Sequence, residues 1–535
     1  MKMASTSNFW LTVTAVTCIK FLFMNCYRST DFEVHRNWLA ITHSLPVSKW
    51  YYESTSQWTL DYPPLFAWFE FLLSHLAKFF DPAMLNVMKL NYATMPTVFF
   101  QRLSVIISDF VYIYAVKQFS HIVMERNKFN QNDPWIERGM IITMLLLWNP
   151  GLLMVDHIHF QYNGMLSGIL LLSMARMIQE KYLEATFWFS VLLNMKHIYF
   201  YIAPAYFVYL LRHYCFIQSK KGSILEWKNF CIYNFLKLSF IVLSVFSISF
   251  GPFILMGQMP QVLSRLFPFK RGLTHAYWAP NIWAVYNTLD KGLALVASYF
   301  HLKEKTVSVQ GAMTGGLIQE YKHEILPSIS PSVTLILTLI SILPVLWVLW
   351  KSPKDPWIFM RGSILCAFGA FLFGWHVHEK AILMVILPLT PLALFQRFEA
   401  EVFLFLATIG HYSIFPLLFK AAETPIKIFL LLLHSVYAFT ALSRIHRPRK
   451  TDGFLPLLNT QESLFLLGLI PLQMYYSFGN KLLGLDQRLP FLPLLLISTY
   501  CAFGIFQMWI KMYKDYTQYK TPVLFTMDGK ELKKS

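Results

Sequence analysis

Long apolar runs, each about 20 residues in length, recur along nearly the whole of this sequence. A helix needs about 20 such residues to cross a hydrocarbon core of about 30 Å. Only 14% of the 535 residues are charged and 56% are hydrophobic, whereas soluble domains are about a quarter charged. We therefore predict an all-α polytopic membrane protein with about fourteen transmembrane helices, at residues 9–27, 97–118, 139–156, 164–179, 184–197, 199–212, 236–256, 331–350, 357–374, 381–395, 401–419, 425–443, 462–478 and 489–511.

The distribution of positive charge predicts which side of the membrane each loop faces. The formal charge of +17 is spread over short loops and forms no single patch, which favours membrane lipids over nucleic acid as partners, since cytosolic loops carry excess Lys and Arg. One further apolar stretch, residues 278–300, contains Asp290 and Lys291. If this stretch does not span, every strongly basic loop between spans faces the cytosol. We therefore predict that both termini are cytosolic and that loops 28–96 and 257–330 are lumenal.

Residues 65–80 of the first lumenal loop are rich in aromatic side chains and carry a polar residue at every fourth position from Glu70, which places these on one helical face. The stretch is too short and too charged to span comfortably. It predicts an amphipathic helix in the membrane interface. An ordinary packed helix of the loop fits the same pattern.

Two charged residues fall inside a predicted span. Arg102 and Asp109 lie seven positions apart on one helical face. Charged groups within a bilayer need partners, so we predict that both pair with neighbouring helices.

Two polar motifs lie in the first lumenal loop. Asp31, Glu33 and Arg36 follow the first span closely, which places them near the headgroup level. A carboxylate there can take a proton from a sugar hydroxyl while that oxygen attacks a lipid-carried donor. Either carboxylate can instead pair with Arg36 at helical spacing. Asp61 and Tyr62 precede paired prolines, and Asp61 can bind a sugar hydroxyl or cap the helix that follows.

A third motif, residues 156–163, packs many hydrogen-bonding side chains into a short loop between spans, among them His157, His159 and Gln161. So many exceed what a simple turn requires. The two histidines also suggest a metal, as does the His-x-His pair that ends at His378. Such a pair without a further ligand motif is weak evidence, so we predict no metal site.

Two further motifs carry positive charge on the side that normally lacks it. Arg265, Lys270 and Arg271 lie in the second lumenal loop, where an anionic ligand such as phosphate explains them. A solvated basic loop is the alternative. His378 and Lys380 lie in a compact turn, and both can donate to a phosphate leaving group as its charge develops. The alternative there is a surface turn with a local ion pair.

Read in order, these motifs are similar to those of a known family. The chain resembles the endoplasmic-reticulum α-1,3-glucosyltransferases of the GT-C superfamily, which extend the lipid-linked oligosaccharide using dolichyl-phosphate-glucose. Within that family, residues 275–281 look more like the enzymes that add the second glucose than those that add the first. The matching segments are residues 31–38, 48–51, 60–65, 102–109, 156–163, 265–272 and 377–383.

The resemblance implies a reaction and roles for residues. The β-linked glucose of dolichyl-phosphate-glucose becomes an α-1,3-linked residue on a dolichyl-diphosphate-linked oligosaccharide, with inversion and with no cofactor or divalent metal. Asp31 is the implied general base, acting on the 3-hydroxyl of the terminal glucose of Glc1Man9GlcNAc2, and His378 is implied to lie near the donor phosphate. Further substrate-binding candidates are Glu33, Arg36, Asp61, Tyr62, His157, His159, Gln161, Arg265, Lys270, Arg271 and Lys380.

The implied organisation is a catalytic GT-C module over residues 1–395, C-terminal helices over 396–511 and a cytosolic tail over 512–535, in the endoplasmic-reticulum membrane with a lumenal active site. Three alternatives stay open. The chain can be the first-glucose enzyme acting on Man9GlcNAc2-diphosphate-dolichol, a transporter of lipid-linked sugars, or a subunit without activity.

Overall fold

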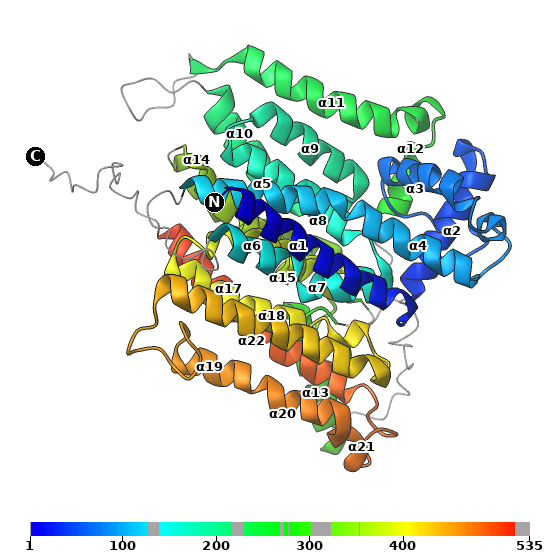
Figure 1. Cartoon of the computed structure of the whole chain (residues 1–535). Helices are drawn as coiled ribbons and strands as arrows, with labels where there is room; N and C mark the ends of the chain where they lie inside the picture. The colour runs from blue at the N-terminus through cyan, green and yellow to red at the C-terminus, as the bar shows by residue number, and fades with distance from the viewer. Residues whose placement is uncertain are drawn as a thin grey trace, which may run out of the picture.

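The computed structural model describes residues 2–126, 138–216, 229–267, 272–275, 278–300, 323–352 and 354–518. Within these ranges every regular element is a helix, and the remaining β-type contacts are isolated bridges. The helices run side by side as a bundle, with α2 (Thr30–Ser44) and α3 (Pro64–Ala77) at one end (Figure 1). The start of α1 (Lys2–Leu22) and the end of α22 (Leu492–Thr517) lie toward the other end.

Nine helical segments of the described residues are long and apolar enough to cross a membrane. They coincide with nine of the predicted spans, so the prediction of a multi-pass membrane protein is confirmed. These segments are formed by α1, by α4 (Met95–Ser108) with α5 (Phe110–Arg126), by α6 (Arg138–Leu147) with α7 (Pro150–Leu152) and the π-helix Leu153–Phe160, and by α11 (Ile232–Leu255), α14 (Pro331–Lys351), α15 (Pro356–Phe373), α17 (Arg397–Tyr412), α18 (Thr424–His446) and α22.

The other five predicted spans fall on shorter or interrupted helices. Prolines 388 and 391 lie inside one of them, α16, where each removes a backbone donor. The span predicted at residues 462–478 is divided into three short pieces. The count of fourteen therefore stays a prediction. The helices concerned are α8 (Asn163–Ile178), α9 (Tyr182–Met195), α10 (Ala203–Leu210), α16 (Leu383–Leu392), α19 (Thr460–Leu467) and α20 (Leu469–Met474).

The apolar stretch at residues 278–300 forms α13 (Ile282–Tyr299), which is not one of the nine segments found in the described residues. The Asp290 carboxylate on this helix accepts backbone N–H groups from residues 324–326 at 2.8–3.0 Å. These bonds tie α13 to another part of the same predicted lumenal loop. They give Asp290 a role that needs no crossing of the membrane.

Helix α3 turns its polar residues inward and its apolar residues outward. Glu70 is fully buried and its carboxylate lies 2.7 Å from Nδ1 of His35 on α2, whereas Leu72 and Leu76 are 66% and 56% exposed. The packed-helix interpretation is therefore right for the polar face. The outer apolar face suits the membrane interface, and that position stays a prediction.

The charged residues inside the spans are paired, as predicted. Asp109 accepts Nζ of Lys20 from α1 at 2.5 Å and lies 2.8 Å from Nε2 of His157. Arg102 donates to the backbone carbonyls of Tyr27, His157 and Ile158, each at 2.8 Å. These contacts bind α1 and α4 to the π-helix that carries the third motif.

Helices α5 and α8 approach closely because glycines face the contact. A Cβ atom added to Gly168 would lie 2.6 Å from backbone atoms of Tyr112, and one added to Gly164 would lie 2.1 Å from the Asp109 carboxylate. The two glycines have the four-residue spacing common in membrane helix pairs. Their small size sets how near α8 comes to Asp109.

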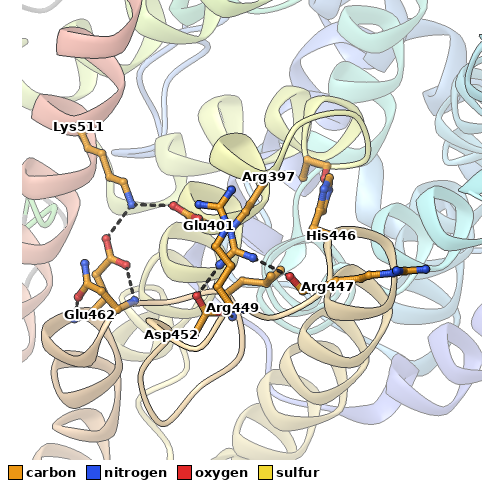
Figure 2. Close-up of polar contacts among 11 residues, drawn as sticks. Arg397, Glu401, His446, Arg447, Arg449, Asp452, Glu462 and Lys511 are labelled. Atoms are coloured by element: carbon orange, nitrogen blue, oxygen red, sulfur yellow. Dashed lines mark hydrogen bonds and ion pairs between the residues drawn. The ribbon is translucent and has the colours of Figure 1, made fainter.

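A polar cluster joins four helices at the end of the bundle where α22 finishes (Figure 2). Arg397 on α17 donates to Glu401, to the Arg447 carbonyl and to Asp452. Nζ of Lys511 on α22 lies 2.9 Å from Glu462, which belongs to the capping box at the start of α19. This cluster fixes α17, α18, α19 and α22 to one another, far along the bundle from α2.

Candidate active site

Asp31 lies in the first turn of α2, and one of its oxygens gathers three donors. The helix begins after Ser29, whose hydroxyl accepts the Asp31 backbone N–H at 3.2 Å. The carboxylate oxygen Oδ2 accepts from Nε2 of Gln161 and lies 3.1 Å both from Nε2 of His159 and from Nζ of Lys380. Sequence reasoning predicted these four residues as site residues, and the structure brings all four together.

The surroundings of Asp31 keep its carboxylate ionised. Burial by itself disfavours the charged form, but the Lys380 ammonium and the hydrogen bond from His159 outweigh it and hold the pKa of Asp31 well below its ordinary value. The start of α2 also favours negative charge through the helix dipole. Among the described residues, the other oxygen, Oδ1, accepts no hydrogen bond. Asp31 thus presents an ionised carboxylate with one unused acceptor oxygen.

The π-helix Leu153–Phe160 orients alternate side chains of the motif at residues 156–163 toward different partners. His157 points to Asp109 and His159 to Asp31. Phe160 ends the element with φ +97, a conformation that non-glycine residues rarely adopt, and Gln161 then turns toward Asp31 as well. Backbone strain of this kind is common at functional sites. His157 therefore contacts the ion pair within the membrane and makes no contact with the carboxylate of Asp31.

A second layer of polar contacts fixes Gln161. Asn163 donates to the side-chain oxygens of Gln161 and Asp156 at 2.7 and 3.0 Å, and accepts Nζ of Lys196 at 3.0 Å. The Lys196 ammonium also lies 5.0 Å from the centre of the Tyr62 ring, within range of a cation–π interaction. Sequence reasoning missed Lys196. The available signal was a lone lysine in a turn between two apolar runs.

Glu33 and Arg36 are engaged with each other. The guanidinium donates from Nη2 to Glu33 at 2.5 Å and from Nε at 3.0 Å, and its Nη1 donates to backbone carbonyls of Met84 and Asn86. The ion-pair alternative is therefore the right one for Glu33. The pair holds α2 against the loop at residues 84–86, and Asp31 is left for Lys380.

The remaining candidates lie around this centre. The N-cap residue of helix α3 is Pro63, which makes no side-chain cap, and the role of Asp61 stays a prediction. Nε of Arg265, on α12 (Met259–Leu266), donates to the Tyr51 carbonyl at 3.0 Å. Lys270 and Arg271 lie outside the described residues.

The fifth motif packs against residues 272–275. Nδ1 of His376 lies 2.8 Å from the Gly272 carbonyl, and Thr274 and Val377 form a parallel bridge. The His275 and His378 rings lie close together in the same region, 4.0 Å between centroids, with their planes tilted by 39°. Ligand-type atoms of His275, His378 and Glu379 lie within 4.8 Å of one another, the one such grouping in the described part of the chain. The histidines of the other His-x-His pair do not share a partner, because His157 lies beside Asp109 and His159 lies beside Asp31.

Fold and site together define a multi-pass membrane protein whose polar centre, a partly buried carboxylate beside basic side chains, lies at one end of a helix bundle. Residues 16–512 match the model of the ALG6, ALG8 glycosyltransferase family. The chain belongs to this family and is a glycosyltransferase.

Curated relatives match along nearly the full length. The dolichyl pyrophosphate Glc1Man9GlcNAc2 alpha-1,3-glucosyltransferase of Mus musculus is 52% identical over 95% of this chain and 96% of its own length. A probable enzyme of the same name from Drosophila melanogaster is 48% identical over 93% and 92%. The Schizosaccharomyces pombe enzyme is 44% identical over 93% and 96%.

Proposed function

We propose that this protein is an inverting α-1,3-glucosyltransferase that moves glucose from dolichyl-phosphate-glucose to the 3-hydroxyl of the terminal glucose of Glc1Man9GlcNAc2 on dolichyl diphosphate. The observation that carries the proposal is the ionised Asp31 carboxylate with its three donors on Oδ2 and its unused Oδ1. The names of its curated relatives supply the substrate. The reaction takes place in the endoplasmic-reticulum lumen, on a GT-C fold with both termini in the cytosol.

The contacts of Oδ2 support proton transfer to the other oxygen, Oδ1. Because Oδ2 is occupied by Gln161, His159 and Lys380, the acceptor hydroxyl meets Oδ1 and gives its proton there. The deprotonating oxygen attacks C1 of the donor glucose on the face opposite the phosphate. The bond between C1 and the phosphate oxygen breaks, dolichyl phosphate leaves with both electrons, and the β-linkage becomes an α-linkage.

Basic side chains are the candidates for binding the phosphate of the donor. Lys380 lies 3.1 Å from Asp31, and His378 is two residues before it, which supports a role for both in stabilising the charge that develops on the leaving group. Arg265, Lys270 and Arg271 are further phosphate-binding candidates, and Lys196 with Tyr62 and Asp61 lines the acceptor side. No metal or other cofactor takes part in this scheme.

The test of the reaction is transfer by the purified protein to acceptors that carry zero, one or two glucoses, with dolichyl-phosphate-glucose as donor. We expect elongation of the one-glucose acceptor alone. Elongation of the acceptor without glucose would instead make the chain a first-glucose enzyme. Absence of transfer to every acceptor would contradict the proposal.

The test of the base is Asp31→Asn. Asparagine keeps the shape but cannot take the proton, so kcat should fall by about 10²–10⁴-fold with an unchanged thermal midpoint. Asp81→Asn is the matched control, because Asp81 caps the short helix Pro82–Leu85 and has no contact with the site. Transfer at the normal rate by Asp31→Asn would refute the assignment.

A further inference from the structure

Glu379 is a buried carboxylate that the proposed mechanism does not use. It is 1% exposed, and neither of its oxygens accepts a hydrogen bond from any described residue. Buried carboxylates ordinarily collect several donors, because ionising one without them is costly. A buried carboxylate without hydrogen-bond donors in the candidate active site suggests a functional role for Glu379.

The groups that face Glu379 are mostly cationic or able to become so. Oε2 lies 3.8 Å from Nδ1 of His275, which belongs to the segment 272–275. His376, His378 and Lys380 come from its own segment, and Asp31 comes from α2. The buried Nδ1 of His378 has no hydrogen-bond partner either within the described part of the chain. Among the described residues, Glu379 is therefore the acid grouped with the His275 and His378 imidazoles, whereas Asp31 is engaged by Lys380, His159 and Gln161.

The Glu379 carboxyl group titrates near neutral pH. Burial raises the pKa of Glu379 to about 7, against the opposing effect of the Lys380 charge. Burial, the neighbouring His275 and Lys380 lower the pKa of His378. Two rings 4.0 Å apart cannot both be cationic, because like charges at that distance repel strongly. A proton on Glu379 is therefore easily gained or lost near neutral pH, whereas a proton on His378 is disfavoured.

We propose that Glu379 is a positioning residue that passes its proton to the His275–His378 pair when the donor phosphate binds, so that one imidazolium faces the leaving group. The O–H bond of Glu379 breaks as an N–H bond forms at Nδ1 of His275, and the carboxylate then pairs with the new cation. The net charge does not change, and the proton returns when dolichyl phosphate leaves. The sugar hydroxyl proton goes separately to Asp31. This inference rests on the proposed function.

Glu379→Gln tests the inference, because glutamine has the same size but can neither give the proton nor stabilise the imidazolium. In the wild type, kcat should decline as the pH rises through about 7, where the shared proton is lost. In Glu379→Gln this decline should move to lower pH by about one unit or more, because the carboxylate no longer raises the histidine pKa. The KM for the acceptor should stay unchanged.

Two further variants keep the test decisive. Glu379→Asp retains an acid and should recover part of the wild-type profile. Glu462→Gln changes another buried glutamate at the far end of the bundle and should leave the profile unchanged. If Glu379→Gln does not fold, His275→Asn should show the same downward shift, because it removes the proton acceptor.

An alkaline decline that stays in place in both Glu379→Gln and His275→Asn would overturn the inference. Activity lost in chelator and restored by a divalent ion would also overturn it, because the three side chains would then hold a cation instead of a shared proton. Absence of transfer by the wild type is a different result, which refutes the proposed function itself.

Discussion

The two oxygens of Asp31 have different surroundings, and the difference defines what the residue can do. Oδ2 is held by Gln161, His159 and Lys380, whereas Oδ1 is not used by any described residue. The sequence predicted these four residues as members of a site, but it could not assign them to one oxygen. It left open whether Glu33 or Asp31 pairs with Arg36, and the structure shows the pair at three-residue spacing, Glu33 with Arg36. The burial of Glu379 without hydrogen-bond donors could not be predicted either, because it depends on how residues 272–275 pack against its segment.

Lys380→Met is a prediction at this scale. Without the ammonium, burial dominates and raises the pKa of Asp31, so a higher pH is needed to keep the carboxylate ionised. The loss of transfer activity on the acid side should therefore shift to higher pH by about one unit or more. A pH profile of kcat/KM measures this shift. Lys380→Arg keeps the charge, so its kcat/KM should fall at the same low pH as in the wild type. If kcat/KM fell at the same pH in both variants, the prediction would be contradicted.

At the scale of elements, the site depends on helices that are irregular or short. The π-helix Leu153–Phe160 separates His157 from His159, and the short α9 places Lys196 at its end. Periodicity predicted membrane helices at these positions, but it carries no information about a π-turn or about a residue at φ +97. Hydropathy also predicted spans over α9 and α10, and these stay predictions, because apolar composition is the same in a buried short helix and in a crossing one.

Gly168→Ala is the prediction for the contact between α5 and α8. The added Cβ meets backbone atoms of Tyr112 at 2.6 Å, which cannot rotate away, so the helices must separate. The free energy of unfolding should fall by about 1–3 kcal/mol, seen as a lower thermal midpoint in detergent. Gly251→Ala on α11 is the control, because a Cβ there meets nothing within 4 Å. Equal midpoints for the two variants would refute this account.

At the scale of the whole molecule, polar clusters fix the helices at different levels of the bundle. Lys20, Asp109 and His157 join α1 to α5 and the π-helix within the membrane-crossing segments. The cluster around Arg397 joins α17, α18, α19 and α22 near the end of the last helix (Figure 2). The sequence predicted that charged residues in the spans are paired, but it could not name partners that lie on distant helices.

Lys20→Met is the prediction at this scale. Removing the ammonium leaves the Asp109 carboxylate charged and buried, which should lower the free energy of unfolding by roughly 3–5 kcal/mol. Adding Asp109→Asn removes the uncompensated charge, so the double variant should recover most of that loss. Thermal unfolding of both variants in the same detergent is the measurement. A double variant no more stable than Lys20→Met would contradict the ion-pair account.

The three donors to Oδ2 come from parts of the chain that a ribosome makes at very different times. Gln161 follows Asp31 by 130 residues, but Lys380 follows it by 349. A nascent chain that has inserted only its first helices therefore carries the Asp31 carboxylate before its counter-charge has been translated. Under the proposed function, we expect catalytic competence only after Lys380 has been made, and chains that stall earlier should be inactive.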